Sequence, residues 1–264
     1  MNSEMILYTQ IIIVMILDCV LTSVNENELY LDFIPFFIDM WKKLYPSVNV
    51  KIVLIAESIP DSFSCYKDNI ILFPPIPNVP TAFTSQFIRL LYPCILNYEN
   101  GIMITDIDDV PLNNTYFTEN IKDISNDKWI NLRDWTGKGN NQIAMCWQIA
   151  TSKTWTEVFN IHNLDDVKKT LIDYGKNGAR YGWGTDQHVL YKNVMTWHDK
   201  TKNYIFLKDK ETGFNRITRK RVGLKDKKVI ENIKKGFYSD YHCHRPMKDY
   251  YELNYGILKL CSSI

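Results

Sequence analysis

The sequence predicts a single α/β domain with a central, mostly parallel sheet flanked by helices. Residues 19–24 and 50–55 are apolar runs typical of buried strands, and residues 29–45 between them have helical periodicity. A strand, a helix and a second strand in this order begin a βαβ unit, which builds a parallel sheet. The 264 residues show no internal repeat or low-complexity linker, so one continuous domain is the simplest interpretation.

The segments that follow continue this alternation of strands and helices. The first predicted helix carries its apolar side chains on one face: Leu31, Ile34, Phe37, Ile38, Trp41 and Leu44. Prolines between residues 74 and 80 interrupt regular structure, and a helix over 84–96 is expected to begin at a cap, Thr84 or Ser85. Further strands are predicted at residues 70–73, 101–105, 129–132 and 143–149, and further helices at 155–159, 167–174 and 186–194.

Residues 1–18 are an apolar lead-in, and residues 19–264 form the predicted domain. A spanning helix needs about 20 apolar residues and a signal peptide begins with positive charge, whereas this chain opens Met-Asn-Ser-Glu. We interpret the lead-in as the approach to the first buried strand, with a degenerate signal peptide or membrane anchor as the alternative. A glycosylation sequon at Asn113 lies close to an acidic cluster, which favours a cytoplasmic location over a membrane-anchored or secretory one.

The overall composition excludes several classes of function. A hydrophobic fraction of 45% with 23% charged residues is ordinary for a folded protein, so disorder is excluded for most of the chain. The formal net charge is +1 and no nucleic-acid-binding module is recognisable, so we expect no nucleic-acid partner. The same balance means that association with a membrane is not required.

An acidic cluster follows the predicted strand at residues 101–105. Asp106, Asp108 and Asp109 lie where this strand ends, and alternation along the chain sends Asp106 and Asp108 to the same side. Carboxylates this close repel one another unless a cation neutralises them, and oxygen ligands suit Mg²⁺ or Mn²⁺. The alternative is a solvated acidic turn, since Asp, Asn and Pro favour turns. The regular spacing of a calcium-binding EF-hand loop is missing.

Three motifs resemble those of a known family. They are residues 85–93 (Ser-Gln-Phe-Ile-Arg-Leu-Leu-Tyr-Pro) followed by an apolar strand and Asp106-Ile107-Asp108, residues 182–187 (Gly-Trp-Gly-Thr-Asp-Gln), and residues 242–248 (His-Cys-His-Arg-Pro-Met-Lys). Over residues 19–250 the chain resembles the nucleotide-diphospho-sugar transferases of the GT-A fold, and among them the glycogenin and lipopolysaccharide-galactosyltransferase type, glycosyltransferase family 8. The resemblance implies transfer of a sugar from a nucleoside diphosphate donor, a UDP-sugar, to a hydroxyl acceptor.

The resemblance also implies a metal and diphosphate site. Asp106 and Asp108 would hold Mn²⁺ or Mg²⁺, and either His242 or His244 would complete the coordination as a neutral imidazole. Cationic side chains nearby would contact the donor phosphates, and these are Arg89, Arg245 and Lys248. For Arg89 the alternative is a surface ion pair, and for the histidines it is a packed or surface role.

The Asp186-Gln187 pair is the catalytic candidate that the resemblance implies. In an inverting enzyme Asp186 would take the acceptor proton as general base, and in a retaining enzyme Asp186 or Gln187 would stabilise the reacting sugar. The alternative for Asp186 is the N-cap of the predicted helix at 186–194. Both stereochemical outcomes stay open.

Other polar residues at strand ends complete the expected site. Thr22, Ser23 and Asn25 end the first strand and are expected to cradle the nucleotide, with Tyr30 stacked on the base. The residues expected near the acceptor follow a later strand, and they are Asn131, Arg133 and Asp134. The basic residues after Lys200 are interpreted as a solvated face, and they are Arg216, Arg219, Lys220, Arg221, Lys225, Lys227 and Lys228.

Two other classes of function compete with sugar transfer. A nucleotidyltransferase or phosphotransfer enzyme would also use a carboxylate metal site, but it needs a further strand-borne carboxylate that the sequence does not indicate. A catalytically silent sugar-binding domain would keep the fold without turnover. The Asp106 and Asp108 pair, together with Asp186 and His244, argues against a silent domain.

Overall fold

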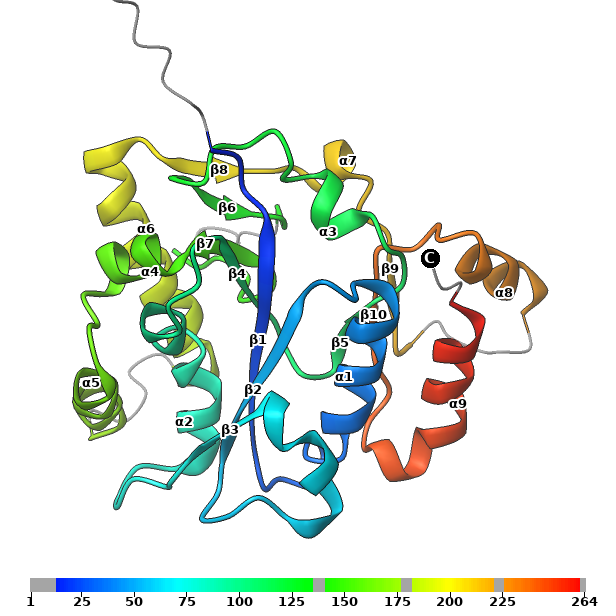
Figure 1. Cartoon of the computed structure of the whole chain (residues 1–264), viewed down its shortest axis with the longest axis horizontal. Coiled ribbons are helices and arrows are strands. Elements are labelled where there is room, and N and C mark those ends of the chain that lie inside the picture. Colours follow the sequence, from blue (N-terminus) through cyan, green and yellow to red (C-terminus); the bar gives the residue numbers. More distant parts are fainter. Residues whose placement is uncertain (1–12, 135–140, 177–181, 221–225, 262–264) are drawn as a thin grey trace, which may run out of the picture.

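A large sheet and a small sheet organise the chain (Figure 1), and the computed structural model describes residues 13–134, 141–176, 182–220 and 226–261. The 7-stranded sheet consists, in spatial order, of β3 (Ile70–Phe73), β2 (Asn49–Ile55), β1 (Leu17–Asn25), β4 (Gly101–Ile104), β7 (Gln148–Thr151), β6 (Trp129–Asn131) and β8 (Tyr204–Phe206). All neighbouring strands are parallel except that β7 runs antiparallel to both β4 and β6. The predicted α/β class with a mostly parallel sheet is confirmed.

The small sheet has 3 strands and lies beside the carboxyl end of β4. It consists of β5 (Asp109–Pro111), β10 (Asp240–His242) and β9 (Arg216–Thr218). The central strand β10 pairs antiparallel with β5 and parallel with β9. β5 begins at Asp109, the last residue of the acidic cluster, so the chain passes from the large sheet to the small one through Asp106 and Asp108.

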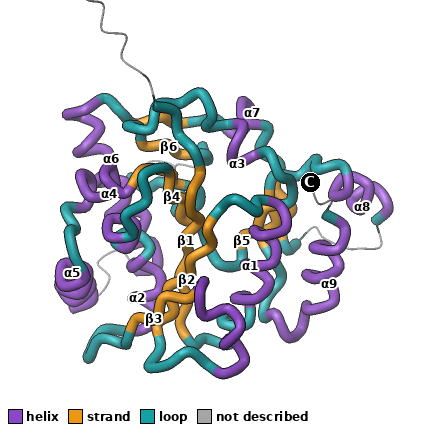
Figure 2. Tube along the Cα trace, viewed as in Figure 1, coloured by secondary structure: helices purple, strands orange, loops and turns teal. Residues whose placement is uncertain are grey.

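Helices cover both faces of the large sheet (Figures 1 and 2). On one side lie α1 (Phe33–Leu44) and α9 (Met247–Leu260), and on the other lie α2 (Thr81–Ile88), α4 (Ser152–Phe159), α5 (Leu164–Lys176) and α6 (Thr185–Thr201). Shorter helices occur in the connections: α3 (Tyr116–Glu119), α7 (Asp209–Thr212), α8 (Lys227–Lys234) and the 3₁₀ turns Asp61–Asn69, Tyr92–Ile95 and Gly182–Gly184.

Each face of the sheet has its own hydrophobic cluster because successive strand residues point to opposite faces. In β1, Val20 and Val24 join the cluster under α1, whereas Cys19 and Leu21 join the cluster under α2 and α6. Both clusters are buried, so both faces of the strand must be apolar. This is why apolar residues stand at consecutive positions from Cys19 to Leu21, before the small polar residues Thr22 and Ser23.

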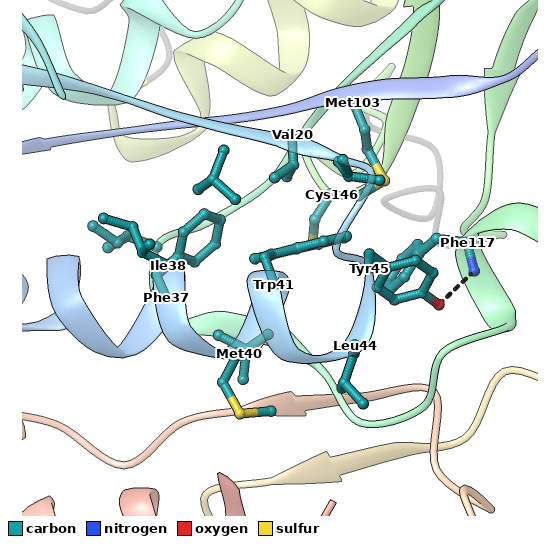
Figure 3. Close-up of a cluster of buried hydrophobic side chains, with 14 of the residues drawn as sticks. Val20, Phe37, Ile38, Met40, Trp41, Leu44, Tyr45, Met103, Phe117 and Cys146 are labelled. Atoms are coloured by element: carbon teal, nitrogen blue, oxygen red, sulfur yellow. Dashed lines mark hydrogen bonds between the residues drawn. The ribbon is translucent and has the colours of Figure 1, made fainter. Parts of the chain in front are cut away.

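Trp41 is central to the cluster under α1 (Figure 3). Its indole is fully buried and lies 5.3 Å from the ring of Phe117 and 5.2 Å from the ring of Tyr45. The Phe117 N–H donates a hydrogen bond of 3.2 Å to the Tyr45 hydroxyl, which ties α3 to the end of α1. The predicted helical face of residues 29–45 is therefore confirmed, although α1 begins only at Phe33.

Some predicted boundaries are wrong. The helix expected over 84–96 begins at Thr81 and ends at Ile88, and Thr84 is not its cap. Thr84 is fully buried inside this helix, where its hydroxyl donates to the Pro80 carbonyl at 3.2 Å. The strand expected at 143–149 begins only at Gln148.

The described end of the lead-in belongs to the fold. Residues 1–12 lie outside the described residues, but Met15 is buried and its N–H donates to the Ile124 carbonyl at 2.6 Å. β1 begins at Leu17, inside the predicted lead-in. None of the helices in the described ranges is both long and apolar enough to cross a bilayer.

Candidate functional site

A cavity of about 450 Å³ opens at the edge of the large sheet where β1, β4 and β6 end. The strand directions bring these carboxyl ends together, and ligands of open α/β sheets bind at such an edge. The residues that line the cavity include Ser23, Asn25, Asn27, Tyr30, Gln86, Arg89, Asp106, Asp108, Arg133, Cys146, Trp183, Asp186, Gln187, Arg216, Arg219, His242 and Arg245. The acidic cluster, the Asp186-Gln187 pair and part of the C-terminal motif therefore meet in one cavity.

Asp106 is paired with Arg89 from the end of α2. The Arg89 guanidinium also donates to the Thr105 carbonyl at 3.1 Å and lies 3.3 Å from the Asp186 carboxylate. Burial works to raise the pKa of Asp106, but the charge and hydrogen bond of Arg89 outweigh it and hold the pKa below its usual value. Arg89 is buried rather than on the surface, and its N–H groups serve to position two carboxylates.

Asp108 is surrounded by two arginines and a histidine of the C-terminal region. Its Oδ2 lies 3.0 Å from Arg219, 3.5 Å from Arg245 and 3.5 Å from the Nε2 of His242. Arg219 also contacts the His242 ring nitrogen, so its guanidinium lies against both groups. Asp108 and His242 come from segments far apart in the sequence, and the pairing of β10 with β5 brings them together.

Asp109 turns away from the cavity and joins a buried cluster with Arg216 and Asp240. Arg216 donates from one nitrogen to Asp109 and from another to Asp240, and both carboxylates are fully or almost fully buried. Burial raises the pKa of Asp109 well above its usual value, and nearby Asp240 adds to the effect against the opposing charge of Arg216. Asp109 therefore ties the strands of the small sheet together and is not among the residues that line the cavity.

Asp186 lies in the first turn of α6 at the cavity wall. It is almost fully buried and its Oδ2 is 3.3 Å from Arg89, while Gln86 donates to its Oδ1 at 3.3 Å. Burial raises the pKa of Asp186 to about 6, with Arg89 opposing the shift. The N-cap of α6 is Gly184, so the alternative interpretation of Asp186 as a cap is wrong.

The residues predicted around the first strand divide into two groups. Ser23, Asn25 and Tyr30 line the cavity, and the Tyr30 ring lies under the Arg245 guanidinium at 4.8 Å. Thr22 is fully buried within β1 and does not line the cavity, so its prediction as a nucleotide contact is not supported by its position.

Two residues of the C-terminal motif also lie away from the cavity lining. Lys248 is exposed and its ammonium pairs with Glu28 at 3.0 Å on the surface. The His244 ring stacks at 4.6 Å on Tyr250, and burial lowers the pKa of this histidine. Of the two candidate histidines, it is His242 whose imidazole borders the cavity.

Several residues at this edge could hold a divalent cation. Asp106, Asp108 and His242 offer two carboxylates and an imidazole to the same cavity, and carboxylate oxygens suit Mn²⁺ or Mg²⁺. In this structure Asp106 pairs with Arg89, and Asp108 pairs with Arg219 and Arg245, so a cation would take the place of these ion pairs. A second group brings ligand atoms of Asp106, Asp109 and Cys146 within 4.8 Å of one another. That group fits less well because a thiol is too soft a ligand for these ions.

The cavity arginines of the small sheet are what sequence reasoning missed. Arg216 and Arg219 were expected on a solvated face, but ion pairs with Asp109, Asp240 and Asp108 direct them inward. Lys220, Lys227 and Lys228 are exposed as expected, whereas Arg221 and Lys225 lie outside the described residues. An apolar residue between Arg216 and Thr218 was the available signal, because alternation around Ile217 marks a short strand.

Comparisons with known proteins establish the fold. No protein-family model and no curated protein matches the chain. Among solved structures, the galactosyltransferase LgtC, solved in complex with donor and acceptor sugar analogues, is similar with a TM-score of 0.50 and 11% identity over 93% of this chain and 97% of that one. The glycosyltransferase GlyE of Streptococcus pneumoniae TIGR4 is similar with a TM-score of 0.52 and 14% identity over 94% of this chain. The match spans 61% of the GlyE chain.

The fold of this chain is therefore the GT-A-like fold of these glycosyltransferases, as the sequence predicted. Identities this low establish the architecture alone, so the chemistry has to be argued from the cavity itself.

Proposed function

We propose that this protein is a metal-dependent glycosyltransferase that moves a sugar from a nucleoside diphosphate donor, a UDP-sugar, to a hydroxyl acceptor. The observation that carries the proposal is the meeting of Asp106, Asp108, His242 and Asp186 at the strand-end cavity of a GT-A-like fold. The solved relatives in fold are glycosyltransferases, and LgtC was crystallised with donor and acceptor sugar analogues.

The strand order supports a placement of the donor along this edge. Asn25 ends β1 and Tyr30 follows it, and the two offer an amide and an aromatic ring to the nucleoside. Asp106 and Asp108 follow the neighbouring strand β4, where they and His242 would hold Mn²⁺ or Mg²⁺. When bound, the cation would supply Lewis-acid stabilisation of charge on the donor diphosphate.

The arginines of the cavity would bind the phosphates directly. Arg219 and Arg245 lie against Asp108, and their guanidinium groups can form charge-assisted hydrogen bonds to phosphate oxygens. Both Arg245 and Lys248 were expected at the phosphates, and in this proposal only Arg245 keeps that role because it lines the cavity.

Asp186 is the carboxylate proposed for the reacting centre. A carboxylate whose pKa is about 6 is a stronger base than an ordinary aspartate, and it can accept a proton from an acceptor hydroxyl near neutral pH. The neighbouring Gln187 also lines the cavity and offers an amide to the sugar. With inversion Asp186 acts as general base, and with retention one of the two side chains stabilises the positive charge that develops on the sugar.

The cytoplasmic location stays a prediction, and the sequon residue supports it. The Asn113 side-chain amide donates to the Tyr238 carbonyl at 2.9 Å and to the Gly236 carbonyl at 3.3 Å. A glycan on that nitrogen would replace one of its two N–H groups and so remove one of these hydrogen bonds, and we propose that Asn113 is not glycosylated.

Incubation with a panel of UDP-sugars, Mn²⁺ and simple sugar acceptors tests the proposal. ¹H NMR spectra would follow donor consumption and give the anomeric configuration of the product, which decides between inversion and retention. We expect turnover that EDTA abolishes and that Asp186→Asn lowers by about 10²-fold or more. Folded protein that consumes no UDP-sugar, or that works equally well in EDTA, would contradict the proposal.

A further inference from the structure

Arg133 lies at the part of the cavity that follows β6. In the sheet order β1, β4, β7 and β6, the nucleoside side chains follow β1 and the metal-binding carboxylates follow β4. Arg133 is therefore on the far side of the diphosphate position from the nucleoside, where the transferred sugar and the acceptor would meet.

The Arg133 guanidinium is held in place by Asp209 of α7 and by Phe214, the second residue after this helix. Its Nε donates to the Asp209 carboxylate at 3.3 Å, and its planar group lies 3.8 Å from the centre of the Phe214 ring. Asp209 and Phe214 belong to one turn, because Gly213 takes a positive φ of 73° and the Phe214 N–H donates to the Asp209 carbonyl at 3.0 Å. One rigid turn thus presents both contacts to the arginine.

The backbone of Arg133 is fixed as well. Its N–H donates at 3.1 Å to the side-chain oxygen of the fully buried Asn131, which also accepts from Gln148 at 2.8 Å. Asp209 accepts from the Asp134 N–H at 3.1 Å, and Asp134 accepts from the Asp209 N–H at 3.3 Å. A side chain fixed in this way loses little entropy when it binds a ligand.

Arg133 differs from the other cavity arginines in what its terminal nitrogens contact. Arg89 and Arg216 each bind two carboxylates, and Arg219 lies against Asp108 and His242. Within the described ranges the Nη groups of Arg133 have no hydrogen-bond partner, while the residue lines the cavity. A fixed guanidinium whose two Nη groups are without partners can donate two parallel hydrogen bonds to a carboxylate or phosphate.

We propose that Arg133 binds an anionic group, a carboxylate or phosphate, on the sugar being transferred or on the acceptor. That the anionic group belongs to a sugar rests on the proposed function. The anion site itself follows from the position and contacts of Arg133. Arg133 is thus a specificity-determining residue that favours charged over neutral sugars.

Two binding experiments separate the sources of the anion. In the donor arm, UDP-glucuronate and UDP-glucose are titrated calorimetrically with Mn²⁺ into wild-type protein and Arg133→Met. In the acceptor arm, ligand-observed NMR compares glucuronate, glucose 6-phosphate and glucose, with and without UDP. Arg133→Lys keeps the charge but loses the fork, and Lys122→Met removes an exposed cation that does not line the cavity.

We expect wild-type protein to bind the charged ligand about tenfold or more tightly than the neutral one in one of the two arms. In Arg133→Met the affinities for the charged and the neutral ligand should lie within about twofold of each other, while the affinity for UDP alone is unchanged. Arg133→Lys should show a preference for the charged ligand between those of wild type and Arg133→Met. Lys122→Met should behave like wild type. Thermal melting of each variant checks that it is folded.

Equal affinity for charged and neutral ligands in both arms would overturn the proposal. The proposal would also be overturned if folded Arg133→Met lost as much affinity for UDP as it lost for the charged sugar. If UDP fails to bind wild-type protein but glucuronate or glucose 6-phosphate binds through Arg133, the anion site stands and the proposed function fails.

Discussion

The large sheet and the small sheet are stabilised by different forces. The inner strands of the large sheet are buried on both faces by apolar side chains, and α1 alone contributes eight buried residues to this core. Each strand of the small sheet has only three residues, and its alternation puts Val110, Ile217 and Tyr241 on one face.

The other face of the small sheet is charged, with Asp109, Arg216, Asp240 and His242 upon it. The candidate site forms where this charged face meets the carboxyl ends of the large sheet. Burial of apolar side chains therefore stabilises the large sheet that supports the site. Ion pairs stabilise the charged face of the small sheet, which forms the other side of the site. Four substitutions test this division, beginning with the largest expected effect.

Trp41→Ala is expected to have the largest effect. It removes a fully buried indole from the core under α1 and should lower the free energy of unfolding by about 3–5 kcal/mol. Urea denaturation measures the loss, which should be the same at about pH 5 and about pH 8 because no ionisable group is removed. Trp41→Phe is the matched control, since it keeps a ring and should cost much less. A strongly pH-dependent loss in Trp41→Ala would contradict the division.

Arg216→Met tests the small sheet. It leaves Asp109 and Asp240 buried without their cation, and removal of one partner of a buried pair costs about 3–5 kcal/mol. Loss of the arginine charge should raise the pKa of Asp109 further above its usual value in the folded state. The destabilisation should therefore grow as pH rises from about 4, where the Asp109 carboxyl can bind a proton, toward about 8.

Urea denaturation of Arg216→Met at several pH values measures this dependence, with Arg216→Lys as the variant that keeps the charge. A loss independent of pH, or a loss that is larger in acid, would show that ion pairing does not hold the small sheet.

Asp186→Asn tests how much burial of the Asp186 carboxylate lowers the stability of the folded protein. Its folded pKa of about 6 lies above the usual value, so the folded protein holds a proton that the unfolded chain releases. The contribution of this residue to stability should therefore fall by about 2 kcal/mol as pH rises from about 4 through the folded pKa to about 7, then stay constant. The variant has no carboxyl there and should lack this fall.

Thermal or urea unfolding of both proteins across this range gives the difference between them. A difference that does not vary with pH, or one in which wild type gains stability as pH rises, would show that Asp186 is not held in a desolvating site.

Lys248→Ala is expected to have the smallest effect. The ammonium pairs with exposed Glu28 and does not line the cavity, so calorimetry should show unchanged UDP affinity. Arg245→Met is the comparison, because Arg245 lines the cavity and its loss should weaken UDP binding by about tenfold. If Lys248→Ala weakened binding as much as Arg245→Met, the C-terminal motif would act as the sequence resemblance implies.

The two sheets also differ in how far the sequence predicts them. Largely apolar segments made β1, β2 and β3 recognisable in the sequence. The helical spacing of apolar residues made α1 recognisable, because a helix buried on one face repeats its apolar residues with the helical period. The predicted helix at 84–96 was too long, because α2 ends at Ile88 and a 3₁₀ turn follows at Tyr92–Ile95. Pro93 was the local signal against a continuous helix.

The site was predictable where its residues follow such elements. Asp106, Asp108 and Asp186 line the cavity, as do Ser23 and Asn25, since strand ends and helix starts fix their place. The inward turn of Arg216 and Arg219 depends on pairing between strands far apart in the sequence, which no local pattern encodes. The fixed position of the Arg133 guanidinium likewise depends on contacts with Asp209 and Phe214, which form only in the folded chain.

The central claim is that Asp106 and Asp108 form a metal-dependent site for a nucleoside diphosphate. Calorimetric titration of wild-type protein with UDP, with and without Mn²⁺, tests it most directly, with GDP as the nucleotide control. Asp108→Asn and Asp108→Ala remove the ligand, and Asp127→Asn is the matched control because Asp127 is exposed and does not line the cavity. The account predicts UDP binding that requires Mn²⁺, is lost in both Asp108 variants and is unchanged in Asp127→Asn. Failure of folded wild-type protein to bind UDP in the presence of Mn²⁺, or equal binding by the Asp108 variants, would contradict it.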